Sequence, residues 1–399
     1  MDGRAGSFSP QISVAGTGTY EAFVPRPLPP EPPLQWDMDM IRLLSEADQA
    51  LGRLDGAARN VLNPDLFVAM YVRREAVLSS QIEGTQSTID DVLKYELNEG
   101  FLGLPPDVNE VVNYVRAMNF GLERLGSLPL SLRLIREIHG ELLRDVRGAE
   151  RSPGEFRTSQ NWIGVANSPM SRATFVPPPV IEMHSALGDL ERFLHDESFP
   201  ALVHSALAHA QFETIHPFMD GNGRVGRLLI TFLLVHRSVL HRPLLYLSVF
   251  LKRNRAEYYE RLMAIRREGD WEGWVRFFLA GVAEAAKEAA ESARAINDLR
   301  ERSRNLLQSV NAGMRALDLL DVLFQRPLVN VNLVKDALGV AFLTANRLVE
   351  RFVEMGLLEE VTGGQRNRMF RYSSYLSIFE EHDDSERRTE VASTLTATD

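Results

Sequence analysis

The sequence predicts a mainly α-helical protein with a β-hairpin flap and a C-terminal winged helix-turn-helix domain. Three observations support this fold class. From about residue 37 to residue 310, most apolar residues recur three and four positions apart, which is the period of a helix that buries one face. Residues 151–180 interrupt that period with short β-prone runs and prolines. Residues 311–377 then give three short helical patterns and a β-prone end.

The composition is that of a globular protein with two or three domains. The chain has 399 residues, of which 45% are hydrophobic and 25% are charged. Its formal net charge of -10 excludes a surface that attracts nucleic acid as a whole, so such a contact would need a local basic patch. The absence of cysteine excludes disulfides and thiolate metal sites and indicates a cytoplasmic location. We expect no signal peptide and no membrane span, because no suitable apolar segment is present.

The first region, residues 1–36, is rich in glycine, serine and proline and ends in PRPLPPEPPLQW. Proline has no N–H to donate to a β-ladder. We therefore expect an extended arm with polyproline II character that lies over a surface and does not join a sheet.

The second region, residues 37–145, is predicted to be helical. Asn63-Pro64 and Ser87 are typical of helix starts, and Gly84 and Gly100 are typical of helix C-terminal ends. The five helical patterns cover residues 37–54, 63–84, 87–100, 109–125 and 131–146.

The third region, residues 146–300, begins with the flap. RTSQNWIGV and RATFV are β-prone and ANSPMS between them is a turn, so we expect a β-hairpin that stops at three consecutive prolines. Helical patterns resume at residue 180, with a break at Gly269-Asp270. Beyond this break, charged residues alternate with alanine, which is typical of a long solvated helix.

The fourth region, residues 301–378, reads as helix, helix, helix and a short β-wing, the order of a winged helix-turn-helix. Such a domain could bind DNA through AFLTANRLVERFVEM, which would be its recognition helix. Glutamates dilute the basic residues nearby, so DNA is an alternative partner that the sequence does not favour. Residues 379–399 are polar and are predicted to be disordered. The basic set consists of Arg347, Arg351, Arg366, Arg368 and Arg371.

The stretch HPFMDGNGRVGR, residues 216–227, carries the densest chemistry of the chain. Glycines flank Asn222 immediately before an amphipathic helix, so backbone N–H groups can turn toward a ligand at the positive end of the helix dipole. This arrangement predicts an anion site suited to phosphate. Arg224 and Arg227 lie one turn apart and can both bind phosphate oxygens there.

Two further side chains in this stretch predict a reaction and not only binding. Asp220 would repel a phosphate unless a cation lay between them, which indicates Mg²⁺. His216 has an ordinary pKa of about 6.5, which suits a general base that removes a hydroxyl proton. Together with the anion site, these groups are what phosphoryl-type transfer requires.

A zinc site and two other nucleotide motifs are not supported. His204, His209 and His216 with Glu213 do not have the His-Glu-x-x-His spacing, and residues five apart do not share a helix face. The chain has no Walker A motif, and no Gly-x-Gly-x-x-Gly motif with a following acid.

The stretch HPFMDGNGRVGR matches the Fic signature H-P-F-x-D/E-G-N-G-R-x-x-R throughout, so the chain resembles the Fic family. FRTSQNWIG, FVPPP, AHAQFETIHPF and EYYERLMAIRREGDW extend the resemblance from about residue 37 to residue 290. The resemblance implies a Fic-type helical core. It also implies a protein adenylyltransferase, which transfers AMP from ATP with Mg²⁺ to a Tyr, Thr or Ser hydroxyl of a target protein, this chain itself included.

The resemblance also implies the role of each signature residue. His216 would be the catalytic base, Asp220 the metal ligand and Arg227 the contact to the γ-phosphate. Other nucleotide contacts are expected from two groups of residues. In the signature turn they are Thr214, Met219, Gly221, Asn222, Gly223, Arg224, Val225 and Gly226. In the flap and the later helix they are Asn161, Trp162, Ile163, Gly164, and one of Tyr258 and Tyr259 over the adenine, with the other in the core.

A second motif, SSQIEG, resembles the family's inhibitory motif S/T-x-x-x-E-G/N. It consists of Ser79, Glu83 and Gly84 with their neighbours, and Ser79 and Glu83 share a helix face. The resemblance implies that Glu83 pairs with Arg227, occupies the γ-phosphate position and holds the enzyme inactive.

Two alternatives remain open. One is another Fic chemistry, either with a different nucleotide or removing AMP with Glu83 positioning a water molecule. The other is a DNA-binding regulator whose core only senses nucleotide. The sequence leaves a homodimer open as well.

Overall fold

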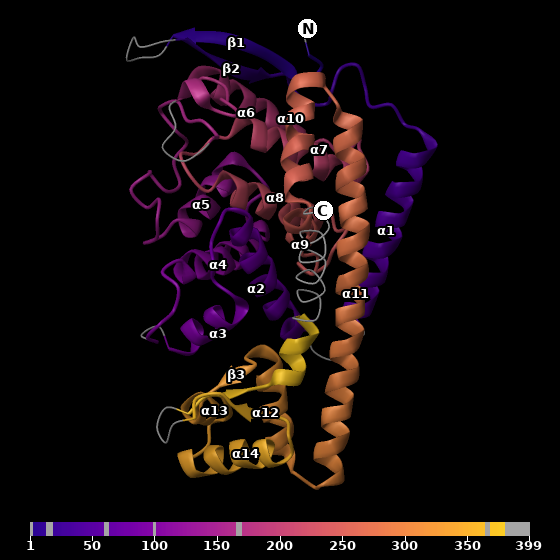
Figure 1. Cartoon of the computed structure of the whole chain (residues 1–399). Coiled ribbons are helices and arrows are strands. Elements are labelled where there is room, and N and C mark those ends of the chain that lie inside the picture. Colours follow the sequence, from indigo (N-terminus) through magenta and orange to yellow (C-terminus); the bar gives the residue numbers. More distant parts are fainter. Residues whose placement is uncertain are drawn as a thin grey trace, which may run out of the picture.

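The structure is a computed structural model that describes residues 3–12, 19–59, 64–98, 101–164, 170–363 and 368–379 (Figure 1). Helices make up most of these residues, so the prediction of a mainly α-helical protein is confirmed. Within the described part of the chain, no helix is both long and apolar enough to cross a membrane.

The N-terminal arm contains two paired antiparallel strands, β1 (Gly6–Ile12) and β2 (Thr19–Pro25). The prediction that it does not join a sheet is therefore wrong for these residues. A sheet of only two strands has two free edges, so Pro10 can lie in β1 without breaking an inner ladder. Phe23 is buried and its N–H donates to the Val176 carbonyl at 2.9 Å, which fixes the hairpin to the helical core.

The N-terminal helical region contains the five predicted helices, with small changes at their ends. The third begins at Ile89 and not at Ser87, because Thr88 caps it and forms a capping box with Asp91. Gly84 has a φ of +100° just after the second helix, as predicted for a C-terminal end, whereas Gly100 lies outside the described residues. The helices are α1 (Met38–Arg59), α2 (Pro64–Ile82), α3 (Ile89–Leu97), α4 (Val108–Leu125) and α5 (Leu132–Leu142).

The central region is built around one fully enclosed helix. Residues 202–215 of α7 are all buried, which explains why ALVHSALAHAQFETI is apolar on nearly every face. The region contains η1 (Met170–Arg172), α6 (Val180–Leu194), α7 (Ala201–Ile215), α8 (Asn222–His236), α9 (Ser248–Arg253), α10 (Arg255–Glu268) and α11 (Trp271–Ser309).

Helix α11 differs from the prediction in two ways. The break before it at Gly269 is observed, with a φ of +71°. However, its alanine-rich face is buried and not solvated, because α1 packs along it (Figure 1). The predicted domain boundary between residues 300 and 301 also falls inside this unbroken helix, so α11 joins the central region to the C-terminal region.

The C-terminal region shows the predicted succession of three helices and a short sheet. Strands β3, β5 and β4 pair antiparallel in that order. Phe379 is buried against Tyr71 of α2, so the predicted disorder is wrong for this residue, whereas residues 380–399 lie outside the described ones. The elements are α12 (Met314–Gln325), β3 (Leu328–Val329), α13 (Val331–Leu338), α14 (Phe342–Glu354), β4 (Glu359–Glu360) and β5 (Phe370–Arg371).

The flap is reduced to a single bridge between Ile163 and Phe175 in the described residues. The predicted two-stranded hairpin is therefore not formed as strands there. Val165 of the first β-prone run and residues 166–169 of the expected turn lie outside the described residues.

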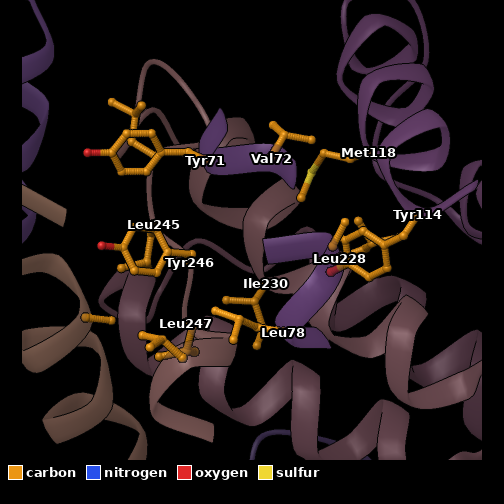
Figure 2. Packing of buried hydrophobic residues seen from close by; sticks show 14 of the residues in the cluster. Tyr71, Val72, Leu78, Tyr114, Met118, Leu228, Ile230, Leu245, Tyr246 and Leu247 are labelled. Carbon is orange, nitrogen blue, oxygen red and sulfur yellow. The ribbon is translucent and has the colours of Figure 1, made fainter. Parts of the chain in front are cut away.

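Helix α2 lies in the centre of the apolar core, and this position determines where the site forms. Figure 2 shows Tyr71 of α2 close to Tyr246, Val72 of α2 close to Met118 of α4, and Leu78 of α2 close to Ile230 of α8. Packing of α2 between α4, α8 and α9 places its last turn at the start of α8.

We predict that two glycine substitutions will change stability in opposite directions. A Cβ at Gly121 of α4 would overlap the buried ring of Phe232, whereas nothing lies within 4 Å of a Cβ at Gly188 of α6. Gly121→Ala should therefore destabilise the protein by about 1–3 kcal/mol. Gly188→Ala should stabilise it by about 0.5–1 kcal/mol, because alanine restricts the unfolded chain. Thermal unfolding of both variants tests this, and an equal shift in both would contradict it.

Candidate active site

The signature stretch forms a sharp loop between α7 and α8. His216 ends α7 with a φ of 48°, and the following Pro217 disfavours a helical conformation there. Gly221 has a φ of 75° directly before α8, a conformation that side chains rarely adopt. The loop therefore leads directly into the first turn of α8, where the sequence predicts an anion site.

Two asparagines hold this loop through its backbone. The Asn222 Oδ1 accepts from the Phe218 N–H and its Nδ2 donates to the Phe218 carbonyl, both at 2.8 Å. The Nδ2 of Asn161 donates to the same carbonyl at 2.8 Å and to the His216 carbonyl at 3.2 Å. Both amides therefore bind the loop itself, and the predicted nucleotide contacts of Asn161 and Asn222 stay predictions.

The structure holds His216 in the neutral form. Its Nδ1 is buried and has no hydrogen-bond partner among the described residues. Burial, together with the guanidinium groups of Arg266 and Arg157, lowers the pKa of His216 to about 3. The ring is therefore neutral at pH 7.

Asp220 is held next to the same loop. Its Oδ1 accepts from the Gly221 N–H at 2.6 Å and lies 3.8 Å from the Arg224 Nη2. The described residues contain no group of three or more acidic or histidine side chains that could hold a metal alone. Mg²⁺ commonly binds one or two carboxylates together with substrate phosphates, so Asp220 fits this ion as one ligand beside a nucleotide.

Arg227 is paired with the last turn of α2. Its Nη2 lies 2.7 Å from the Glu83 Oε1, and its Nε donates to the Ser79 Oγ at 2.7 Å. Partial burial alone would raise the pKa of Glu83, but Arg227 outweighs it, so the pKa is lowered and the carboxylate stays ionised. A Cβ at Gly223 would overlap the Glu83 Oε1, which places this carboxylate against the first turn of α8.

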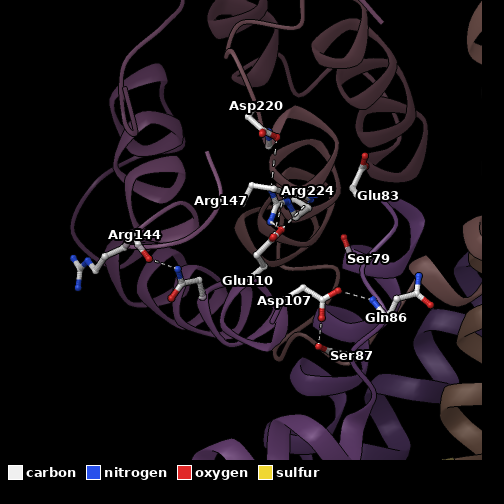
Figure 3. Close-up of polar contacts among 12 residues, drawn as sticks. Ser79, Glu83, Gln86, Ser87, Asp107, Glu110, Arg144, Arg147, Asp220 and Arg224 are labelled. Carbon is white, nitrogen blue, oxygen red and sulfur yellow. Dashed lines mark hydrogen bonds and ion pairs between the residues drawn. The ribbon is translucent and has the colours of Figure 1, made fainter. Parts of the chain in front are cut away.

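Arg224 is paired with a residue that the sequence did not reveal. Its Nη1 donates to the Glu110 Oε2 at 3.2 Å, and both side chains are nearly fully buried. The Nε of Arg147 lies 3.3 Å from the Glu110 Oε1 (Figure 3). Glu110 lies in the first turn of α4, and nothing in its local sequence indicates this contact.

His139 of α5 is a second residue that the sequence did not reveal. The Gly154 N–H donates to its Nδ1 at 2.8 Å, so its Nε2 carries the proton and donates to the Asp220 carbonyl at 3.1 Å. Its ring stacks on Phe218 with centroids 3.7 Å apart. Burial lowers the pKa of His139 to about 4, so it acts as a neutral support of the loop.

Several residues of the predicted nucleotide-binding set make contacts within the protein. Val225 lies in the apolar core, and the Gly226 carbonyl accepts from His209 of α7. The Thr214 hydroxyl accepts from Arg266 and donates within α7. The side chains of Val225 and Thr214 therefore pack within the protein, and the predicted nucleotide contacts at these positions stay predictions.

The two tyrosines separate as the sequence suggested. Tyr258 is buried and its hydroxyl bonds His209, whereas Tyr259 is exposed. Trp162 is also exposed, Ile163 forms the flap bridge and Gly164 follows it. Met219 lies in the loop, and its sulfur accepts from the Ser159 hydroxyl at 3.7 Å.

Comparison with known proteins identifies the family. Residues 41–123 match the family model described as Fic/DOC family N-terminal, and residues 129–234 match the model of the Fic/DOC family. The chain therefore belongs to the Fic/DOC family over these residues, and the resemblance seen in the signature is confirmed.

Individual relatives agree with this assignment. Two curated proteins named protein adenylyltransferase Fic, from Drosophila virilis and Drosophila ananassae, are 30% identical over 210 residues and 31% identical over 173 residues. These matches cover 51% and 42% of this chain, but only 39% and 31% of those proteins. A crystal structure of a Fic family protein from Desulfovibrio desulfuricans is 21% identical, with a TM-score of 0.56 over 85% of this chain and 97% of that chain. It confirms the predicted Fic-type helical core, whereas the winged helix stays a prediction.

We predict that Glu110→Ala will destabilise the protein by about 3–5 kcal/mol, because the buried Arg224 would lose its hydrogen-bonded anion and keep only Asp220, at 3.8 Å. The matched control is Glu46→Ala, which removes an exposed ion pair with Arg42 in α1 and should leave the melting temperature unchanged. Thermal unfolding measures both. An equal effect of the two substitutions would contradict the buried role of Glu110.

We also predict that stability falls as the pH drops from 7 to 5. Burial lowers the pKa of His209 to about 3, whereas an unfolded histidine titrates near about 6.5. Only the unfolded chain takes up this proton between these two pKa values. The contribution of His209 to the free energy of unfolding is therefore complete above about pH 6.5 and falls on acidification by up to about 1.4 kcal/mol per pH unit. Melting temperatures at pH 5, 6 and 7 should depend less on pH in His209→Gln, and an unchanged slope would contradict this.

Proposed function

We propose that the protein is an adenylyltransferase that transfers AMP from ATP to a Tyr, Thr or Ser hydroxyl of a target protein, and that Glu83 inhibits it. The observation that carries this proposal is the Glu83–Arg227 ion pair of 2.7 Å at the first turn of α8. A carboxylate already occupies the place that the loop offers to an anion, as an inhibitor of phosphate binding would.

The chemistry follows from the residues around the loop. The target hydroxyl oxygen forms a bond to the α-phosphorus, the bond from that phosphorus to the bridging oxygen breaks, and pyrophosphate leaves. His216 is neutral and takes the hydroxyl proton, at Nε2 because Nδ1 is buried. Bound Mg²⁺, held by Asp220, would neutralise charge on the phosphate oxygens.

Arginines and backbone groups would bind the rest of the nucleotide. The N–H groups at the start of α8 face the loop and favour an anion. Arg224 and Arg227 are fixed in place beforehand by Glu110 and by Ser79 and Glu83. Tyr259 is exposed on α10 and is the tyrosine that could cover an adenine.

Inhibition would act through the γ-phosphate. While Glu83 pairs with Arg227, this guanidinium is neutralised and a phosphate next to it would meet a carboxylate. ATP would then be bound in an unproductive orientation or not at all. Displacement of the last turn of α2 would free Arg227.

The flap would hold the target. The Ile163–Phe175 bridge leaves a short extended edge beside the loop, and an extended target segment could pair with it by strand addition. Such pairing uses the backbone of the target, so it carries little information about which protein is modified.

The alternative of a DNA-binding regulator has less support. Three of the five arginines expected to bind phosphate bond other parts of the chain. Arg351 donates to the Val310 carbonyl, Arg368 pairs with Glu360 and Arg371 pairs with Asp90. Arg366 lies outside the described residues.

We predict that Glu83→Gly will raise AMP incorporation by about 10–100-fold, because it removes a charged competitor for Arg227. Adding His216→Ala should lower the rate of this variant by about 100–10,000-fold through loss of the base. Both effects are measured in the presence of Mg²⁺ by the transfer of label from α-labelled ATP to protein and by the mass increase of the target.

Glu83→Gln serves as the matched control, since it removes the charge but keeps the size of the side chain, and it should release the activity in part. If Glu83→Gly incorporates no more AMP than the unchanged protein, inhibition by Glu83 is wrong. If no variant is labelled by any nucleotide, the transferase function is wrong. AMP removal by the unchanged protein alone would support the second Fic chemistry.

A further inference from the structure

Arg147 is an exposed arginine close to Asp220 and Arg224, which would hold the metal and the phosphates. Arg147 follows α5, and its side chain is 69% exposed. Its Nε lies 3.3 Å from the Glu110 Oε1, and its Nη2 donates to the Glu110 Oε2 at 3.4 Å. The neighbouring Gly148 packs so closely that a Cβ there would lie 3.1 Å from the Asp220 Oδ2.

Glu110 thus holds two arginines with one carboxylate. Arg224 reaches it from α8 and Arg147 from the segment after α5, and Figure 3 shows both guanidinium groups on the side that faces Asp220. Arg224 is nearly fully buried and therefore fixed, whereas Arg147 can reorient in solvent. Because only Nε and Nη2 of Arg147 face Glu110, its Nη1 remains for another acceptor.

The charges around the first turn of α8 indicate what Arg147 contributes to the site. Arg224 and Arg227 are already matched there by Glu110 and Glu83, and Asp220 adds a further negative charge. Without Arg147, these five side chains carry one more negative than positive charge, which opposes an anionic ligand. Arg147 compensates the charge of Asp220 in the free protein, and displacement of Glu83 then leaves a net positive surface.

We infer that Arg147 binds phosphate oxygens of the nucleotide and that Glu110 is the positioning residue that holds it at the site. The inference rests on the proposed function in that the ligand is ATP. Arg147 would then be a phosphate-binding arginine that lies outside both the signature stretch and α8. Arg144 is a suitable control residue, because it lies three residues before Arg147 and points away from Asp220 (Figure 3). Arg144 pairs with Glu141 instead.

The test measures binding and not turnover. In a Glu83→Gly, His216→Ala background, calorimetry with Mg²⁺ would compare ATP, ADP and adenosine. Arg147→Ala should weaken ATP and ADP about 10–100-fold, the usual effect of a lost charge-assisted hydrogen bond, and should leave adenosine unchanged. Arg147→Lys keeps the charge and should recover part of the affinity. Arg144→Ala makes the same change in net charge and should bind all three ligands like the parent.

Each outcome has one meaning. If Arg147→Ala binds ATP as tightly as the parent, or no more weakly than Arg144→Ala does, the inference is wrong. Equal weakening of adenosine would also overturn it, because the substitution would then have damaged the fold. If the parent binds ATP and Arg147→Ala does not, but Glu83→Gly transfers no AMP, the proposed function fails while the inference stands.

Discussion

A buried guanidinium group governs how this site is assembled. Arg227 is only 2% exposed, and a buried cation requires both an anion and hydrogen-bond acceptors. The last turn of α2 supplies both through Ser79 and Glu83. The same turn can reach Arg227 only because the apolar face of α2 is buried against α4 and α8 (Figure 2). Core packing and active-site electrostatics therefore depend on one helix.

The sequence predicted the parts of the site that are local in the chain. His216, Asp220, Arg224 and Arg227 lie within one loop and the first turns of a helix, so their spacing alone brings them together. Glu83 could be assigned to Arg227 because a family motif links them. Glu110, His139 and the loop-binding role of Asn161 could not be predicted. They come from distant segments, and a single sequence does not show which distant side chains meet.

The errors in the fold have related physical causes. Proline content suggested an N-terminal arm that does not join a sheet, but in a two-stranded sheet proline can lie on a free edge. Alternating charge and alanine in α11 suggested a solvated helix, yet small side chains also allow close packing of two long helices, and α1 covers this face. Composition describes which surfaces a segment can present, whereas tertiary partners decide which of them is covered.

The amide of Asn222 has a consequence for the thermodynamics of ligand capture. It pairs with both backbone groups of Phe218, and Asn161 and His139 bind the same loop from outside. The loop is therefore rigid before any anion arrives, and its N–H groups are already oriented. An incoming ligand loses its own freedom but orders little of the protein, so the entropic cost of binding falls mainly on the ligand. Affinity can then be controlled by a single competing carboxylate, without refolding of the loop.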